Sequence, residues 1–168
     1  MKKIISVVLV AVMLLALLPA ALTVNAATYS GDCGDNVTWS LNTSTGVLTI
    51  SGTGDMRDYG YESNSRAPYL KYPIVSVEIS DGVTSIGDNA FYECSSLMSV
   101  KIPNSVTIIG DRAFVNCIRL TSITIPESVT SIGKGVFDSC SSFKSITGKP
   151  GSYAETCANE NGISFVGN

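Results

Sequence analysis

Apolar residues recur with a period of 23 positions through the centre of the chain. Three consecutive segments, 75–97, 98–120 and 121–143, align with one another without a gap. The recurring positions are Val77/Val100/Ile123, Ile79/Ile102/Ile125, Val83/Val106/Val129, Ile86/Ile109/Ile132, Phe91/Phe114/Phe137, Cys94/Cys117/Cys140 and Leu97/Leu120/Phe143. Self-similarity of this length indicates stacked repeats, each too small to bury its own apolar edge.

The pattern inside one repeat predicts a coil. Val77 and Ile79 alternate with polar residues, which indicates a strand with one buried face, and a second short alternation follows it. A turn comes next, where we expect Asp88 to cap one short helical turn that carries Phe91 inward. Stacked coils then place their strands side by side in a parallel sheet, about 4.8 Å apart.

The end of the chain predicts a cap on the stack. Residues 144–146 begin a fourth repeat, but the sequence 148–151 contains two glycines and a proline that interrupt it. Residues 152–155 match a capping box, which predicts a short helix ending near Gly162. Residues 163–166 then predict a final strand.

The segment before the repeats predicts a second cap. Residues 37–41 and 47–50 alternate apolar and polar positions around a turn, which predicts a β-hairpin. Trp39, the only tryptophan, is expected to close the open end of the core, with ligand stacking as the alternative. Residues 51–73 are rich in Gly, Asp, Asn, Ser and Tyr and predict an irregular loop.

That loop is one of two candidate binding surfaces. It contains Tyr59, Tyr61 and Tyr69, and tyrosine is favoured at recognition sites. The alternative is that these rings pack over the first repeat, and the sequence leaves both readings open. The other candidate is the outward face of the strands, with residues Ser76, Glu78, Ser99, Lys101, Ser122, Thr124 and Ser145. The candidate binding residues are therefore Tyr59, Tyr61, Tyr69, Glu78, Lys101 and Thr124, with the tyrosine loop favoured because the strand face lacks aromatic anchors.

The recurring string SVTSIGxxAFxxCxxLxSIxIP resembles the BspA-like class of bacterial leucine-rich repeats, also described as treponemal surface-protein-like. The resemblance covers residues 74–143, and Val136 departs from it where the family has alanine. A terminal GSYAETxAxENG segment is similar to the caps of such arrays. The resemblance implies a mainly β solenoid in an exported or cell-surface protein, and a role in binding an extracellular protein or glycan.

These observations divide the chain into four parts. They are a signal peptide over 1–26, an N-terminal β-hairpin cap and tyrosine-rich loop over 27–73, three 23-residue leucine-rich repeats over 74–143, and a C-terminal helix-strand cap over 144–168. The signal peptide rests on Lys2 and Lys3, the apolar run 4–18 and a small-residue cleavage site after Ala26. An uncleaved anchor is the alternative, although the run is short for a bilayer.

Charge and composition restrict the partners. Cleavage leaves nine basic and fourteen acidic residues, a net charge of −5 without basic clusters. Such a chain is not expected to bind nucleic acid or to insert into a membrane after cleavage, and we expect it to be secreted or held at the cell surface.

The reactive side chains predict no enzyme and no cofactor or metal. The sequence contains no histidine, which removes the usual base of nucleophilic catalysis and the commonest metal ligand. Cys94, Cys117 and Cys140 predict a buried ladder of thiols, whereas the pairing of Cys33 and Cys157 stays open. Two alternatives to a binding protein remain: a glycan-active enzyme that uses loop carboxylates such as Asp55 and Asp58, and a structural repeat protein without a tight ligand. The sequence names neither the ligand nor the oligomeric state.

Overall fold

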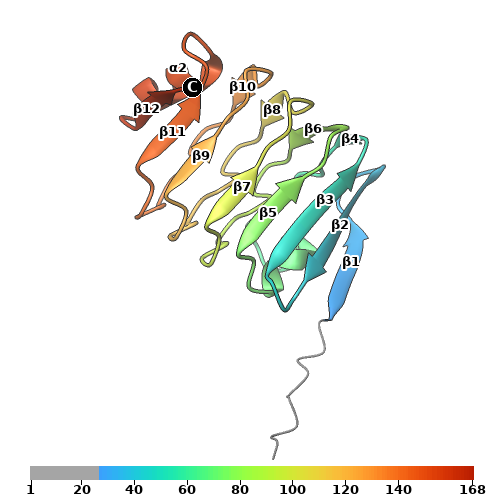
Figure 1. The fold of residues 1–168 in the computed structure, drawn as a ribbon. Coiled ribbons are helices and arrows are strands. Elements are labelled where there is room, and N and C mark those ends of the chain that lie inside the picture. The colour runs from blue at the N-terminus through green and yellow to red at the C-terminus, as the bar shows by residue number, and fades with distance from the viewer. Residues whose placement is uncertain (1–26) are drawn as a thin grey trace, which may run out of the picture.

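The computed structural model describes residues 27–168, in which coils of chain stack into a solenoid (Figure 1). The predicted signal peptide lies outside the described residues. The predicted mainly β solenoid with parallel strands, an N-terminal hairpin cap and a C-terminal helix-strand cap is confirmed. Within residues 27–168, no helix is long and apolar enough to cross a bilayer.

One side of every coil contributes a strand to a long sheet. Its strands are β1 (Thr28–Asp32), β2 (Val37–Asn42), β3 (Val47–Gly52), β5 (Ser76–Ile79), β7 (Ser99–Lys101), β9 (Ser122–Thr124), β11 (Ser145–Gly148) and β12 (Ser164–Gly167). The hairpin strands pair antiparallel, and β3, β5 and β7 are parallel, as are β9, β11 and β12. The first five strands form one hydrogen-bonded sheet and β9, β11 and β12 form another. Figure 1 shows β7 and β9 side by side, so the two sheets make one face from β1 to β12, called the long sheet below.

A second parallel sheet lies behind the first. It comprises β4 (Gly54–Asp55), β6 (Val83–Ile86), β8 (Ile108–Ile109) and β10 (Ser131–Ile132). The prediction of an irregular loop over 51–73 was therefore wrong at β4, which pairs with β6, and at the 3-10 helix η1 (Pro68–Lys71). Strand β4 has only two residues, one of them a glycine, so the sequence shows no alternation of apolar and polar positions there. Only its pairing with the neighbouring coil identifies it as a strand. No alternation of apolar and polar residues predicted β1, a short polar strand that pairs with β2.

The corners that join the sheets hold the coils together through the backbone. The N–H groups of Asn89, Phe91 and Glu93 donate to carbonyl oxygens of the next coil at 2.9, 2.8 and 2.8 Å. Alternate residues point along the stack because Asn89 and Glu93 adopt left-handed φ angles of 52° and 61°. The corner is thus a third column of hydrogen bonds between coils, in place of the predicted helical turn.

Asp88 serves this column instead of capping its own turn, so the predicted cap was wrong. Its Oδ1 accepts the N–H of Asp111 at 2.7 Å, and Asp111 Oδ1 accepts the N–H of Lys134 at 2.8 Å. One coil earlier, Asp58 Oδ1 accepts the N–H of Asp88 at 2.8 Å.

The core is built from columns of identical side chains. Phe91 and Phe114 are fully buried, with ring centroids 5.3 Å apart, and Phe137 follows Phe114 at 5.9 Å. The predicted thiol ladder is present beside them: Cys117 Sγ donates to the Phe91 carbonyl at 3.3 Å and Cys140 Sγ to that of Phe114 at 3.0 Å. All five cysteines of residues 27–168 are free and buried.

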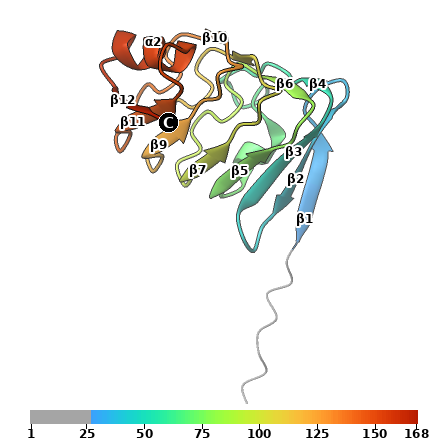
Figure 2. The same ribbon diagram turned by 45° about the horizontal axis from the view of Figure 1, so that its top comes forward.

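The two caps close the ends of this core. Helix α2 (Tyr153–Glu160) lies at the end of the stack beside β11 and β12 (Figure 2). The predicted capping box does not form: Ser152 makes no side-chain cap bond, and the Glu155 side chain accepts the N–H of Gly151, the residue before the N-cap, at 2.7 Å. At the other end Trp39 packs edge-on against Tyr69, with ring centroids 5.6 Å apart, which fits the expected closure of the core.

Candidate functional site

The outward face of the long sheet aligns polar side chains into columns. In-register pairing places Ser76 beside Ser99, and Ser145 between Ser122 and Ser164. A second column consists of Ser30, Ser40, Thr49, Glu78, Lys101, Thr124, Thr147 and Val166. Hydroxyl groups repeat at the strand spacing of about 4.8 Å, in the second column on both sides of Glu78 and Lys101, and each hydroxyl can both donate and accept a hydrogen bond.

The second column opens onto a groove at the carboxyl ends of the strands. A hollow of about 470 Å³ is lined by Glu78, Lys101 and Asn104, and an adjoining one of about 410 Å³ by Asn104, Thr124 and Lys149. The two hollows share Ile102 and Asn104 and together cross four coils. The structure thus brings the predicted residues Glu78, Lys101 and Thr124 together along one continuous polar groove, called the edge groove below.

Charges alternate along the edge groove. Glu78 and Lys101 are exposed on neighbouring strands. The Lys149 ammonium forms an ion pair with the Glu127 carboxylate of the neighbouring coil. This pairing raises the pKa of Lys149. A surface with both signs and many hydroxyls suits a neutral or zwitterionic polar polymer better than a strongly charged one.

Two of the three candidate tyrosines are not on the surface. Tyr69 is 0% exposed and Tyr59 is 8% exposed, with ring centroids 6.2 Å apart in an edge-on contact. Burial raises the pKa of Tyr59 to about 12. The two rings form the aromatic end of the core and pack over the first repeat, as the alternative interpretation predicted. They are therefore not available to contact a ligand. The sequence could not separate the two readings because the loop lacks a periodic pattern.

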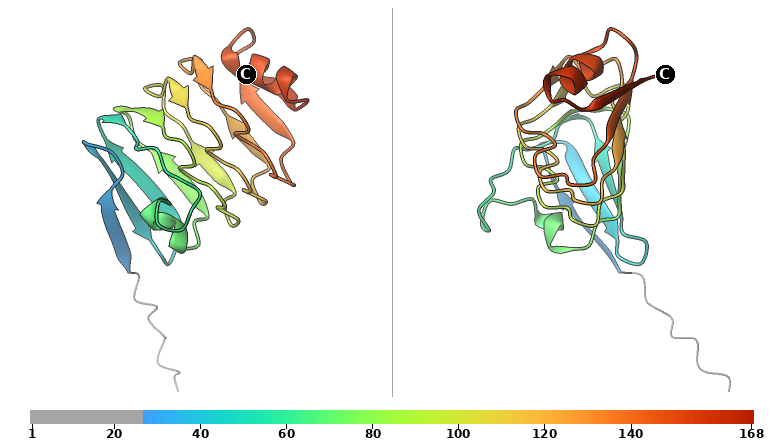
Figure 3. Two further views of the ribbon diagram at one scale, coloured as in Figure 1. Left: turned by 180° about the vertical axis from the view of Figure 1, so that it is seen from behind. Right: turned by 90° about the vertical axis from the view of Figure 1, so that its left-hand side faces the viewer.

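Tyr61 is the exposed member of the three, at 64%. It lies in the exposed segment 61–65, which stands away from the stack of coils (Figure 3). Arg66 anchors this segment through an ion pair with Glu93 and a position 5.1 Å from the centroid of the Tyr92 ring. No sequence motif signals this anchor, because its partners belong to the next coil.

The loop carboxylates are already engaged in holding coils together. Thr84 Oγ1 donates to Asp55 Oδ1 at 2.6 Å, and this bond, with a second from Ser85, lowers the pKa of Asp55. A catalytic acid needs a raised pKa, so this environment does not favour the glycosidase alternative. Within residues 27–168, no three His, Cys, Asp or Glu side chains are grouped to hold a metal ion.

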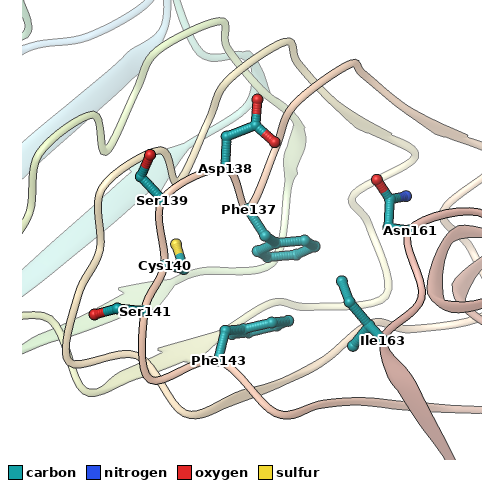
Figure 4. Close-up of a pocket in the computed structure, with 8 residues that line it drawn as sticks. All are labelled: Phe137, Asp138, Ser139, Cys140, Ser141, Phe143, Asn161 and Ile163. Atoms are coloured by element: carbon teal, nitrogen blue, oxygen red, sulfur yellow. The ribbon is translucent and has the colours of Figure 1, made fainter.

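A further hollow of about 310 Å³ lies between the third corner and the C-terminal cap (Figure 4). Its floor is the stacked pair Phe137 and Phe143, whose ring centroids are 4.4 Å apart, and Asn161 and Ile163 line the cap side. Phe137 is only partly buried, unlike its two fully buried equivalents. This corner hollow is absent from the sequence pattern, since it exists where the repeat stops.

Comparison with known proteins adds the following. A family model described as BspA type leucine rich repeat region (6 copies) matches residues 65–157. A leucine-rich repeat protein from Eubacterium ventriosum is 26% identical with a TM-score of 0.52, over 74% of this chain and 45% of that chain. A leucine-rich repeat protein from Bacteroides capillosus is 23% identical with a TM-score of 0.47, over 71% and 98% of the two chains. A leucine rich cell surface protein from Faecalibacterium prausnitzii is 25% identical with a TM-score of 0.34, over 71% and 45%. The curated proteins gave no match. This chain thus spans less than half of the Eubacterium ventriosum protein.

Proposed function

The chain belongs to the BspA-type leucine-rich repeat family, as its repeat string predicted, and on this premise we propose that it is an exported binding protein whose ligand lies on the strand face and the edge groove. The ligand is an extracellular protein or glycan. The observation that carries the proposal is the alignment of Glu78, Lys101 and Thr124 in one polar groove.

The physical support comes from the regularity of this face. Columns of hydroxyls at about 4.8 Å provide repeated donors and acceptors to an extended polar ligand. A rigid sheet keeps these groups in place before binding, which reduces the entropy lost on association. The proposed ligand contacts move from the tyrosine-rich loop to the strand face because Tyr59 and Tyr69 are buried.

The same proposal includes export. Its support is the arrangement of positive, apolar and small residues over 1–26, together with the acidic charge of the remaining chain. Expression of the full chain in a bacterial host is expected to release a protein that begins at Ala27. N-terminal sequencing of the medium and membrane fractions tests this, and recovery of an intact Met1 terminus in the membrane contradicts it.

The binding proposal is tested with immobilised extracellular-matrix proteins, mucin and polysaccharides. A triple variant with Glu78→Ala, Lys101→Ala and Thr124→Ala is expected to lose at least about tenfold in affinity, which is 1.4 kcal/mol. The matched control is Thr107→Ala with Thr130→Ala, which changes exposed residues immediately before β8 and β10, away from the strand face. Equal loss in both variants, or loss only with Tyr61→Ala, contradicts the strand-face proposal. Absence of saturable binding across the whole panel supports the structural alternative instead.

A further inference from the structure

The backbone hydrogen bonds between corners all run the same way along the stack, from the N–H groups of one corner to the carbonyl oxygens of the next. In the second corner the N–H groups of Arg112, Phe114 and Asn116 donate to the carbonyl oxygens of residues 134, 136 and 138 at 3.0, 3.0 and 2.9 Å. The first corner donates to the second in the same way. Each of these two corners therefore presents three N–H groups, on alternate residues, to the next corner, which has the same turn conformation.

The third corner, called the open corner below, keeps this geometry without a further corner stacked on it. Gly135 and Ser139 have φ angles of 61° and 59°, against 54° and 61° at Arg112 and Asn116. Their N–H groups and that of Phe137 therefore point along the stack, toward the C-terminal cap. Within residues 27–168, no acceptor takes the N–H of any of these three residues. The cap covers the two sheets, with α2 against β10 and β11 and β12 against β11, and hollows of about 260 and 310 Å³ remain between the cap and the third corner.

The column of stacked phenylalanine rings also ends at the open corner. The column Phe91–Phe114–Phe137 has spacings of 5.3 and 5.9 Å, and the corner hollow lies beside its last ring (Figure 4). Ile163 extends toward the two rings from the cap side. A volume of about 310 Å³ is at the lower end for small-molecule pockets, which suits a single large side chain.

We propose that the open corner is a docking site for a peptide segment of a partner protein that takes up the corner conformation and carries an aromatic side chain. The segment adds a further corner: its alternate carbonyl oxygens accept the N–H groups of Gly135, Phe137 and Ser139, as the second and third corners accept those of the corner before them. Its aromatic ring enters the corner hollow against Phe137 and Phe143. This site is separate from the strand face and does not depend on the proposed function there.

The charge at the corner selects the type of acceptor. Asp138 is exposed at the hollow, and its Oδ2 lies close to the backbone of Gly135. This carboxylate repels phosphate, sulfate and carboxylate groups, so neutral peptide carbonyls are the favoured acceptors for the three N–H groups. A basic residue beside the aromatic one in the segment pairs with Asp138.

The second corner supplies a probe for the test. The ten-residue peptide GDRAFVNSIR copies residues 110–119 with serine in place of Cys117 and contains the aromatic and basic residues that the site requires. Titration into 15N-labelled protein is expected to shift the amide signals of Gly135, Phe137 and Ser139, while those of Glu93 and Asn116 stay in place. A peptide with alanine at the position of Phe114 is expected to bind at least about tenfold more weakly.

Two variants at one position test the hollow itself. Ile163→Trp fills the hollow and is expected to abolish the shifts, whereas Ile163→Ala enlarges it and is expected to retain them. The wild-type titration stands alone if the tryptophan variant does not fold. No shifts with the peptide at about 1 mM, or shifts centred on the free edges of β1 or β12, overturn the proposal, as does equal binding of the peptide without its aromatic ring.

Discussion

The phenylalanine column gives the sharpest test of how the coils are held together. Phe114→Ala removes a fully buried ring that stacks on Phe91 at 5.3 Å and on Phe137 at 5.9 Å. Replacement of a buried phenylalanine by alanine costs about 3–5 kcal/mol. A domain of this size has a total stability of about 5–15 kcal/mol, so this one change removes a large share of it.

Phe137→Ala is the matched comparison, because the same residue type occupies the same place in the next coil. Phe137 is only partly buried and has a ring of the repeat column on one side alone. The expected loss is about half as large, roughly 2 kcal/mol. Phe137 also stacks on Phe143 at 4.4 Å, so the difference between the two variants gives the contribution of the further coil beyond that contact.

The assay is urea unfolding followed by far-UV circular dichroism and by the fluorescence of Trp39, the only tryptophan. Trp39 is 5% exposed in the N-terminal cap, so its emission reports on that end of the stack. Coils interact mainly with their neighbours, and loss of the central ring weakens the coupling between the two ends. In Phe114→Ala the Trp39 transition is therefore expected at higher urea than the circular dichroism transition. Equal destabilisation by Phe114→Ala and Phe137→Ala would refute the reasoning.

Three further predictions concern the contacts between coils. Gly110→Ala is expected to destabilise the protein by about 1–3 kcal/mol, because its Cβ would lie 2.5 Å from Asp88 Oδ1, and Thr107→Ala on the same coil by less than about 0.5 kcal/mol; similar urea midpoints would contradict this. Native protein at pH 8 is expected to leave Cys33 and Cys94 unlabelled by a thiol reagent, since burial raises the pKa of each to about 12, and denatured, unreduced protein to label five thiols; a smaller number shows a disulfide. Thr84→Val is expected to raise the lowered pKa of Asp55 in a carboxyl NMR titration. The stability contributed by the Thr84 bond is present above about pH 4 and is lost as pH falls through the folded-state pKa, so the variant is expected to lack this contribution. An unchanged titration would exclude the bond.

The repeat, its strands and its thiol ladder could be predicted from the sequence, because each rests on a residue type that recurs at a spacing of 23. Val77 and Val100 pair in register because both must bury the same face, and Cys117 lies above Cys94 for the same reason. The outward direction of Glu78, Lys101 and Thr124 follows from the alternation along each strand. The edge groove could not be predicted, since its walls also include Lys149 and Asn168 from the C-terminal cap.

What needed the tertiary structure lies where the repeat pattern is broken. The separation of Tyr59 and Tyr69 from Tyr61 depends on which rings the first coil covers, and the role of Asp88 depends on the backbone of the coil above it. The open corner likewise exists only because α2 and β12 follow the third repeat in place of a fourth corner and leave the N–H of Ser139 without an acceptor. Periodicity by itself determined how one coil resembles the next, since equal coils must bury equal edges. Only the folded stack decided what happens at its ends, where a coil meets something unlike itself.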